Sequence, residues 1–252
     1  MSDILSVIAV AKQAGEAILE IYYADDFDVQ YKSDDSPVTK ADMAANGIII
    51  DGLNSVSDLP VLTEESPVTY EERKGWEKYW LVDPLDGTKN FIAKQGDFTV
   101  NIALIKGQKP VLGVVYIPLT GDMYFAEKGL GAFKNNEPIF NDSNRMDLIA
   151  ATSVFHSTDK MVEFFKEHKI TKITEYGSSL KICKLAEGTI DVYPRLNGTK
   201  EWDTAASHVI ANEAGCKLVD IETRQELLYN KVTLKNNHFI ASRNDLNFSL
   251  PE

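Results

Sequence analysis

The residues with the clearest chemical potential form one short segment, Asp83-Pro84-Leu85-Asp86-Gly87-Thr88, which follows an apolar run. Its two aspartates offer carboxylate oxygens, the ligands that Mg²⁺ prefers. Gly87 has no side chain, so a ligand can approach the backbone closely there. Thr88 stands where a helix would begin, and the exposed N–H groups of such a start favour phosphate. The segment therefore predicts a Mg²⁺-assisted phosphate site, with a plain turn as the alternative, because Asp-Pro-x-Asp-Gly is also a good turn sequence.

Three further segments carry acidic residues at positions that suit a shared site. Glu64-Glu65-Ser66 follows a short strand predicted at 59–63, and alone it would be interpreted as a solvated surface pair. Trp202-Asp203-Thr204-Ala205-Ala206 opens a predicted helix, where an acidic residue also complements the helix dipole. Pro37-Val38-Thr39-Lys40-Ala41-Asp42 contains a predicted capping box between Thr39 and Asp42. None of these segments is specific by itself.

Together and in this order, the four segments resemble the signatures of the inositol monophosphatase-like family, the metal-dependent and lithium-sensitive phosphatases. The resemblance extends over most of the chain. It implies Mg²⁺ as the cofactor, with two to three ions in one site, since carboxylates that converge without cations would repel one another. The implied metal ligands are Glu64, Asp83, Asp86, Asp203 and the carbonyl group of Leu85.

The same resemblance implies the catalytic residues, which are Asp42, Thr88 and Glu64. Thr88 and Asp42 would orient the attacking water and help to deprotonate it. The backbone N–H groups of Gly87 and Thr88 would hold phosphate oxygens. Two nearby cations can stabilise both the attacking and the leaving oxygen of an in-line displacement.

The substrate is suggested by two segments of the C-terminal half. Gly177-Ser178-Ser179-Leu180-Lys181 and Tyr193-Pro194-Arg195 resemble the nucleotide-binding residues of the 3′(2′),5′-bisphosphate nucleotidases within the family. We expect Ser178 to cap a helix, which would place Ser178 and Lys181 on one face to receive a second phosphate. Arg195 would bind phosphate or stack on adenine. His156 resembles a nucleotide contact, although a histidine packed in the core is the alternative.

The implied activity is hydrolysis of the 3′-phosphate of 3′-phosphoadenosine 5′-phosphate to AMP and phosphate. A second implied substrate is 3′-phosphoadenosine 5′-phosphosulfate, which would give adenosine 5′-phosphosulfate in sulfate assimilation. Two alternatives stay open at this point. One is an inositol or other sugar phosphatase of the same superfamily, and the other is a non-catalytic protein that binds metal or nucleotide.

Hydropathy periodicity indicates the elements that must position these residues. Apolar spacing predicts helices at 3–23, with Ser2 as the cap, and from Thr39 onward. A strand at 79–82 ends at Asp83, and strands at 99–105, 111–117 and 123–126 form an antiparallel meander. Beyond residue 146 the prediction alternates strands, at 148–155, 172–176, 189–193, 217–221 and 238–241, with helices at 159–168, 178–187 and 201–214.

This order predicts an α+β protein with a layered αβαβα sandwich. The N-terminal lobe, residues 1–145, would hold an antiparallel sheet, two helices and most metal ligands. The C-terminal lobe, residues 146–252, would be an α/β unit with Asp203 and the residues that determine substrate specificity. A cleft between lobes is a common place for a small-molecule site.

Composition narrows the possible partners. The 252 residues include 26 Lys and Arg against 38 Asp and Glu, a formal net charge of −12. This balance argues against a nucleic-acid partner, which needs a basic face, and leaves a small-molecule substrate. The sequence shows no integral membrane segment and no basic signal-peptide region, so we expect a cytoplasmic protein with two reduced core thiols, Cys183 and Cys216. Peripheral association with the inner membrane stays open.

Overall fold

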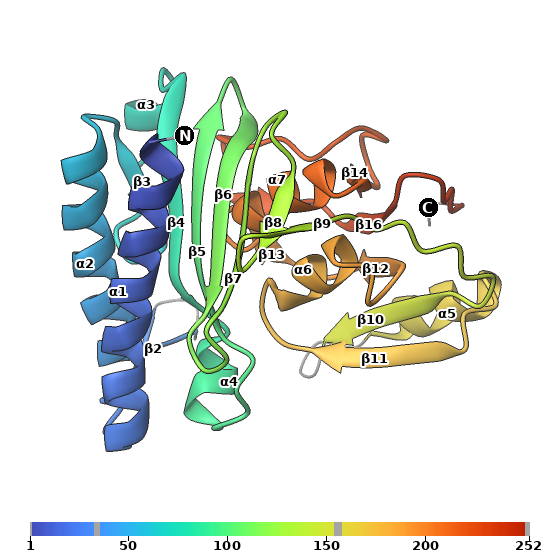
Figure 1. The fold of residues 1–252 in the computed structure, drawn as a ribbon, viewed down its shortest axis with the longest axis horizontal. Coiled ribbons are helices and arrows are strands. Elements are labelled where there is room, and N and C mark those ends of the chain that lie inside the picture. The colour runs from blue at the N-terminus through green and yellow to red at the C-terminus, as the bar shows by residue number, and fades with distance from the viewer. Residues whose placement is uncertain (1, 33–35, 154–157, 250–252) are drawn as a thin grey trace.

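The protein is built of alternating layers of helices and sheets, as seen in a computed structural model that describes residues 2–32, 36–153 and 158–249 (Figure 1). The first helical layer consists of α1 (Ser2–Ala24) and α2 (Lys40–Val56). Their apolar faces pack on one face of a large sheet and form a first core around Ile18, Ile49 and Trp80. A small hairpin of β1 (Gln30–Tyr31) and β2 (Pro37–Val38) connects the two helices.

The large sheet has seven strands in the order β3-β4-β5-β6-β7-β8-β9, and apart from the parallel β3–β4 pair it is antiparallel. The predicted meander is therefore confirmed. Two short helices flank β4, with α3 (Tyr70–Arg73) before it and α4 (Thr88–Ile92) after it. The strands are β3 (Val61–Thr63), β4 (Lys78–Asp86), β5 (Thr99–Lys106), β6 (Lys109–Ile117), β7 (Asp122–Glu127), β8 (Ala132–Lys134) and β9 (Glu137–Ile139).

Two helices lie between this sheet and a second one. The helices α6 (Leu180–Ala186) and α7 (Ala205–Glu213) form one core with the large sheet and another with the second sheet. The outer face of the second sheet is covered by α5 (Asp159–Glu167). The second sheet has the order β11 (Lys172–Tyr176), β10 (Ile149–Ser153), β12 (Val192–Arg195), β16 (Phe239–Arg243) and β14 (Cys216–Asp220).

These cores confirm the predicted αβαβα layering, because each of the two sheets has helices packed on both faces. A two-stranded ribbon of β13 (Thr199–Lys200) and β15 (Lys235–Asn236), which was not predicted, joins the segment before α7 to the segment before β16. Cys183 and Cys216 are buried free thiols, as expected. Among the described residues, no helix is both long enough and apolar enough to cross a bilayer.

The start of α2 follows from its capping residues. Thr39 is the N-cap, and its Oγ1 accepts a hydrogen bond from the Ala41 N–H at 3.2 Å. The Thr39 N–H and hydroxyl both donate to Asp42 Oδ2, at 2.7 and 2.6 Å. The predicted capping box is therefore confirmed. The capping box also holds the buried Asp42 carboxylate in one orientation. It uses only Oδ2 and leaves Oδ1 for another contact.

β4 differs from the prediction because it does not end at Asp83. The strand continues to Asp86 through a register shift, with Asp83 opposite Asn101 and Asp86 opposite Thr99. The shift inserts one extra residue in β4, which is a β-bulge and accommodates the proline. In a regular strand, residues three apart would point to opposite faces. The bulge removes this alternation, and both carboxylates reach the same side.

Three elements of the C-terminal half begin two or more residues later than predicted. The predicted helix at 178–187 begins at Leu180, and its N-cap is Ser179 rather than Ser178. Ser178 has φ +43°, so it forms the turn before the helix. The predicted strand at 189–193 lies at Val192–Arg195, because a turn at 187–188 and irregular chain up to residue 191 come before it. The predicted helix at 201–214 begins at Ala205, since the ribbon and a turn occupy 199–204.

Candidate active site

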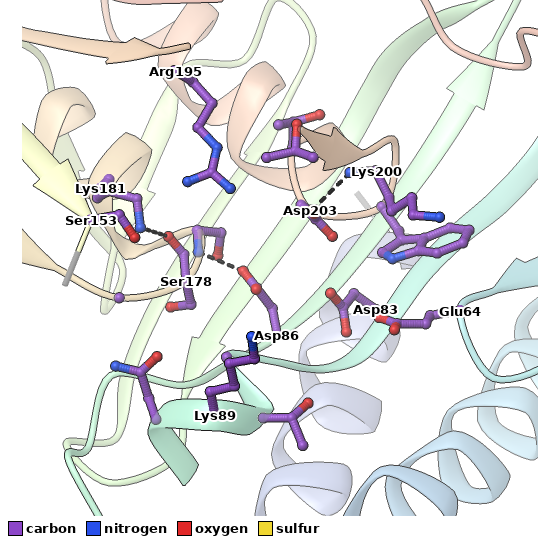
Figure 2. A pocket seen from close by; sticks show the side chains of 18 of the residues that line it. Glu64, Asp83, Asp86, Lys89, Ser153, Ser178, Lys181, Arg195, Lys200 and Asp203 are labelled. Carbon is purple, nitrogen blue, oxygen red and sulfur yellow. Dashed lines mark hydrogen bonds between the residues drawn. The ribbon is translucent and has the colours of Figure 1, made fainter. Parts of the chain in front are cut away.

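One cavity of about 300 Å³ lies where the end of β4, α4, the turn before α6, β12 and the segment before α7 meet. Figure 2 shows Lys181 and Arg195 on one side of it and Glu64 and Asp83 on the other. Asp42 lies behind the cavity wall and is 2% exposed. His156 lies outside the described residues. The remaining predicted site residues all line the cavity: Glu64, Asp83, Leu85, Asp86, Gly87, Thr88, Ser178, Lys181, Arg195 and Asp203.

Three carboxylates from separate segments converge in this cavity. Glu64 follows β3, Asp83 lies in β4, and Asp203 precedes α7, yet one oxygen of each lies within 4.8 Å of the others. Burial raises the pKa of Asp83 well above its ordinary value, and the nearby charges of Glu64 and Asp86 raise it further. Burial, together with Asp86 and Glu64, raises the pKa of Asp203 in the same way. The folded chain therefore holds these groups together against their mutual repulsion.

The donor set fits a hard divalent cation, because every group offered is a carboxylate or carbonyl oxygen. Asp86 Oδ2 is already held by the Ser179 N–H at 2.6 Å, which leaves its other oxygen for a ligand. Burial raises the pKa of Asp86, while the ammonium group of Lys181 opposes that rise. The Leu85 carbonyl and the Gly87 backbone line the same cavity.

Lys32 is an unexpected neighbour of this cluster. Its Nζ lies 2.8 Å from Glu64 Oε1 and also 2.8 Å from Glu65 Oε1. Burial lowers the pKa of Lys32, but the charge of Glu64 and the hydrogen bonds to both glutamates raise it more, so that the pKa lies above its usual range. In this structure Glu64 therefore faces a positive charge from the hairpin. The sequence offered no signal for this contact, because it joins two segments that are distant in the chain and depends on the tertiary arrangement.

Thr88 connects the cavity to Asp42. Its Oγ1 lies 3.2 Å from Asp42 Oδ1 and 3.2 Å from the Leu85 carbonyl oxygen. One hydroxyl hydrogen can serve only one of these acceptors at a time, and the hydroxyl oxygen keeps lone pairs for a water. Burial raises the pKa of Asp42, against hydrogen bonds from Thr39 and Thr88 that lower it. The arrangement can therefore orient a water in the cavity and take up its proton.

The predicted basic residues are held on the opposite wall. Lys181 Nζ donates to the carbonyl oxygens of Ser178, at 2.7 Å, and Tyr176, at 3.1 Å, and lies 5.4 Å from the centre of the Tyr193 ring. Burial lowers the pKa of Lys181 to about 7, with a further lowering by Arg195 and an opposing effect of Asp86. Arg195 Nη2 donates to the Gly198 carbonyl at 3.0 Å. Both cations are buried beside the cavity before any ligand is bound.

Two glycines allow the segments around the cavity to approach each other. Gly87 has φ +93°, and a Cβ on it would lie 2.8 Å from the Asp97 carbonyl oxygen. A Cβ on Gly177 would lie 2.6 Å from Asp97 Cβ and 2.8 Å from Asn90 Nδ2. The Gly177 N–H donates to Asp97 Oδ2 at 2.8 Å. The turn that carries Ser178 is thus fixed against the end of β4 and against α4.

Several residues that line the cavity were not predicted as site residues, among them Lys89, Asn90, Lys200 and Trp202. Lys200 Nζ lies 5.9 Å from the Trp202 ring centre. The backbone N–H of Lys200 donates to Asp203 Oδ2 at 2.8 Å. Lys89 and Asn90 directly follow Thr88. Their place in the motif was the available signal, because a helix that begins at Thr88 must place its first turn beside the cavity.

Comparison with known proteins gives a consistent result. The model of the inositol monophosphatase family matches residues 1–249. The chain is 45% identical, over 219 residues, to the 3′(2′),5′-bisphosphate nucleotidase CysQ of Salmonella typhimurium strain LT2, a match that covers 85% of this chain and 89% of that one. Among solved structures, CysQ of Bacteroides thetaiotaomicron superposes with a TM-score of 0.88 at 39% identity, covering 97% of this chain and 98% of that one. SuhB of Bartonella henselae gives 0.82 at 27% identity, covering 97% and 95%.

Proposed function

Because the chain belongs to the inositol monophosphatase family, we propose that it is a Mg²⁺-dependent phosphatase that hydrolyses the 3′-phosphate of 3′-phosphoadenosine 5′-phosphate to AMP and phosphate. The observation that carries the substrate assignment is the pair of buried cations, Lys181 and Arg195, in the wall opposite the carboxylate cluster. A phosphate monoester needs one anion site, which the metals would provide. A second phosphate would give Lys181 and Arg195 an anion to bind.

The metal assignment rests on the oxygen donors. We assign Glu64, Asp83, Asp86, Asp203 and the Leu85 carbonyl as ligands of two to three Mg²⁺ ions. When bound, these ions supply Lewis-acid stabilisation of the attacking and leaving oxygens in an in-line displacement. Glu64 would exchange its contact with Lys32 for contact with the metal. The ions would also favour the charged forms of Asp83 and Asp203, whose pKa values are raised by burial and by their acidic neighbours.

The remaining residues of the site orient the water and move its proton. The Thr88 oxygen accepts a hydrogen bond from the attacking water while its own hydrogen points to Asp42 Oδ1. As the water oxygen bonds to phosphorus, a water proton passes to Thr88 and the Thr88 proton passes to Asp42. The bond between phosphorus and the ribose 3′-oxygen breaks, and that oxygen leaves as an alkoxide, which takes a proton from a solvent water to become the hydroxyl, while Asp42 gives its proton back to solvent. The raised pKa of Asp42 suits this task, because a stronger base accepts the proton more readily.

The proposal includes two statements about the setting of the enzyme. The first is that 3′-phosphoadenosine 5′-phosphosulfate is a second substrate, because its sulfated 5′-phosphate is also anionic and would meet the same two cations. The second is a cytoplasmic location, which suits an acidic chain whose two cysteines are buried free thiols. A small-molecule nucleotide is the partner that we propose, in keeping with the similarity to a 3′(2′),5′-bisphosphate nucleotidase.

The test is phosphate release from a panel of esters with saturating Mg²⁺. The panel contains 3′-phosphoadenosine 5′-phosphate, adenosine 3′-monophosphate, inositol 1-phosphate and fructose 1,6-bisphosphate. We expect the highest kcat/KM for the adenosine bisphosphate, by about tenfold or more over the monophosphate, which lacks the second charged contact. Preferential turnover of inositol 1-phosphate would overturn the substrate assignment, and binding without turnover would overturn the enzyme assignment.

A further inference from the structure

One cation of the cavity wall has no part in the proposed function. Lys89, the second residue of α4, lines the cavity and is exposed. Figure 2 shows its side chain extending from α4 on the side of the cavity. The side chain forms no ion pair or hydrogen bond within the part of the chain that the structure describes. Its ammonium group can therefore bind a ligand in the cavity without giving up a contact to the protein.

The direction of Lys89 follows from the geometry of α4, in which successive residues are turned by about 100° around the axis. Thr88 is directed to the carboxylate behind the cavity wall. Asn90 packs against Gly177, with Nδ2 2.8 Å from the place that a Cβ would occupy there. Phe91 is buried in the first core. Lys89 therefore lies between the directions of Thr88 and Asn90, on the side of α4 that faces away from the core.

The turn that packs against α4 also holds one of the buried cations. Ser178 follows Gly177 in this turn, and its carbonyl accepts a hydrogen bond from Lys181 Nζ at 2.7 Å. Ser178 Cβ lies 3.4 Å from the place that a Cβ would occupy on Gly87, the N-cap of α4. The turn and the start of α4 are thus in contact. Lys89 stands at this junction, between the reacting centre and the wall that carries Lys181.

Charge favours the second phosphate as the partner of Lys89. In the proposed enzyme the hydrolysed phosphate meets Mg²⁺ and backbone N–H groups, and the metal ions would repel another cation. The donors at the second phosphate are partly used within the protein. Lys181 Nζ already donates to two carbonyls, and Arg195 Nη2 donates to a third. The Lys89 ammonium offers three donors that are not used in this way.

We infer that Lys89 is a specificity-determining residue, whose ammonium group binds the substrate's second phosphate, the one that is not hydrolysed. The inference rests on the proposed function, because it requires a bisphosphate substrate. It adds a third cation to a subsite that contains Lys181 and Arg195, and this cation comes from α4. Lys89 and Lys181 then hold the same phosphate from two elements, whereas a monophosphate leaves Lys89 in solvent.

The experiment compares two ratios. The kcat/KM for 3′-phosphoadenosine 5′-phosphate is divided by that for adenosine 3′-monophosphate, in the wild type and in Lys89→Met, with saturating Mg²⁺. We expect the ratio to fall about 3- to 30-fold in the variant, less than for a buried contact, because solvent screens an exposed lysine. The fall should come from the bisphosphate, with less than about twofold change for the monophosphate.

A matched control separates contact from net charge. Lys128 is also exposed and has no side-chain partner among the residues described, but it does not line the cavity. Lys128→Met makes the same change in net charge and should leave the ratio unchanged. Lys89→Arg keeps the cation and should retain most of the preference. All three variants should keep their Tm within about 2 °C, because each changes an exposed side chain.

The outcomes are distinct. If the wild type does not prefer the bisphosphate, the proposed function fails, and the inference fails with it. If the wild type prefers the bisphosphate and Lys89→Met keeps the same ratio, only the inference is overturned. An equal loss for both substrates would place Lys89 on the hydrolysed phosphate and overturn it. A fall of the same size in Lys128→Met would assign the effect to net charge and also overturn it.

Discussion

The buried carboxylates of the site repel one another, and the fold holds them together despite this repulsion. Asp83 is 2% exposed, and burial with its acidic neighbours raises its pKa. A carboxyl group with a raised pKa in the folded state binds its proton more tightly there than in the unfolded chain. The stability contributed by this group is therefore lost as pH rises through the interval between its unfolded and folded pKa values. At neutral pH, without metal, Asp83 destabilises the protein.

Asp83→Asn should consequently stabilise the metal-free protein while it abolishes activity. We expect a Tm at pH 7, in EDTA, about 2 °C or more above the wild type, since Asn removes the repelling charge. Turnover with Mg²⁺ should fall about 10³-fold or more. Scanning calorimetry measures the Tm, and phosphate release measures the turnover. Unchanged turnover in the variant would refute the role of Asp83 as a metal ligand.

Thr88 gives a prediction about the chemical step. Thr88→Ala removes the hydroxyl that joins the cavity to Asp42, and kcat should fall about 10²- to 10⁴-fold with little change in KM. Thr88→Ser keeps the hydroxyl and should retain most of the activity. Steady-state kinetics on the three proteins provide the measurement. A rise in KM at constant kcat would show that Thr88 only binds substrate.

Lys181 predicts a pH dependence of substrate choice. Its pKa is lowered to about 7, so the free enzyme loses this positive charge as pH rises through that value. The kcat/KM for the adenosine bisphosphate, relative to adenosine 3′-monophosphate, should therefore fall between pH 6.5 and 8.5, and Lys181→Met should have a low, flat ratio. Changes that both substrates share belong to the metal site and cancel in the ratio. A wild-type ratio that stays constant or rises with pH would contradict this assignment.

At the scale of elements, the site depends on close contacts between segments distant in the sequence. A Cβ on Gly177 would meet Asp97 and Asn90 at under 3 Å. Gly177→Ala should push the turn with Ser178 and the start of α6 away from α4, lowering the Tm and raising KM for the bisphosphate about tenfold or more. Gly75→Ala is the control, because a Cβ there meets nothing within 4 Å. Equal effects of the two substitutions, measured by melting curves and kinetics, would sink this explanation.

The elements also show where sequence reasoning succeeds and where it stops. The start of α2 was predictable because Thr39 and Asp42 satisfy each other within four residues. The cap of α6 was not, because Ser178 and Ser179 look alike in sequence and tertiary contacts decide between them. The Ser179 N–H is bound by Asp86, and its hydroxyl lies 2.8 Å from Asn101 Oδ1. Signals within a short stretch of sequence determine local structure. The position of the α6 cap depends instead on contacts with β4 and β5.

The same distinction applies to the candidate site. The predicted ligand positions were implied by the resemblance of short motifs to those of the family, and the structure places Glu64, Asp83 and Asp203 together. The bulge that turns Asp83 and Asp86 to one side was not predictable, because Pro84 indicated an end of the strand. The contact of Lys32 with Glu64 also requires the tertiary arrangement. The roles of the site residues stay predictions, as does the division into lobes near residue 145.

At the scale of the whole molecule, charge explains why metal is required. The chain carries a net charge of −12, whereas the residues that line the cavity include four acidic ones, Glu64, Asp83, Asp86 and Asp203, and four basic ones, Lys89, Lys181, Arg195 and Lys200. The cavity is thus balanced within an acidic protein, and an anionic nucleotide gains little from it alone. In the proposed enzyme, bound Mg²⁺ would make the cavity positive and supply the attraction.

The most direct test of this account is a ³¹P NMR time course of 3′-phosphoadenosine 5′-phosphate with the protein, once with Mg²⁺ and once with EDTA. With Mg²⁺, the 3′-phosphate signal should disappear as inorganic phosphate and AMP appear, and the 5′-phosphate signal should persist. With EDTA, the spectrum should not change. Loss of the 5′-phosphate, or equal hydrolysis in EDTA, would contradict a Mg²⁺-dependent 3′-nucleotidase.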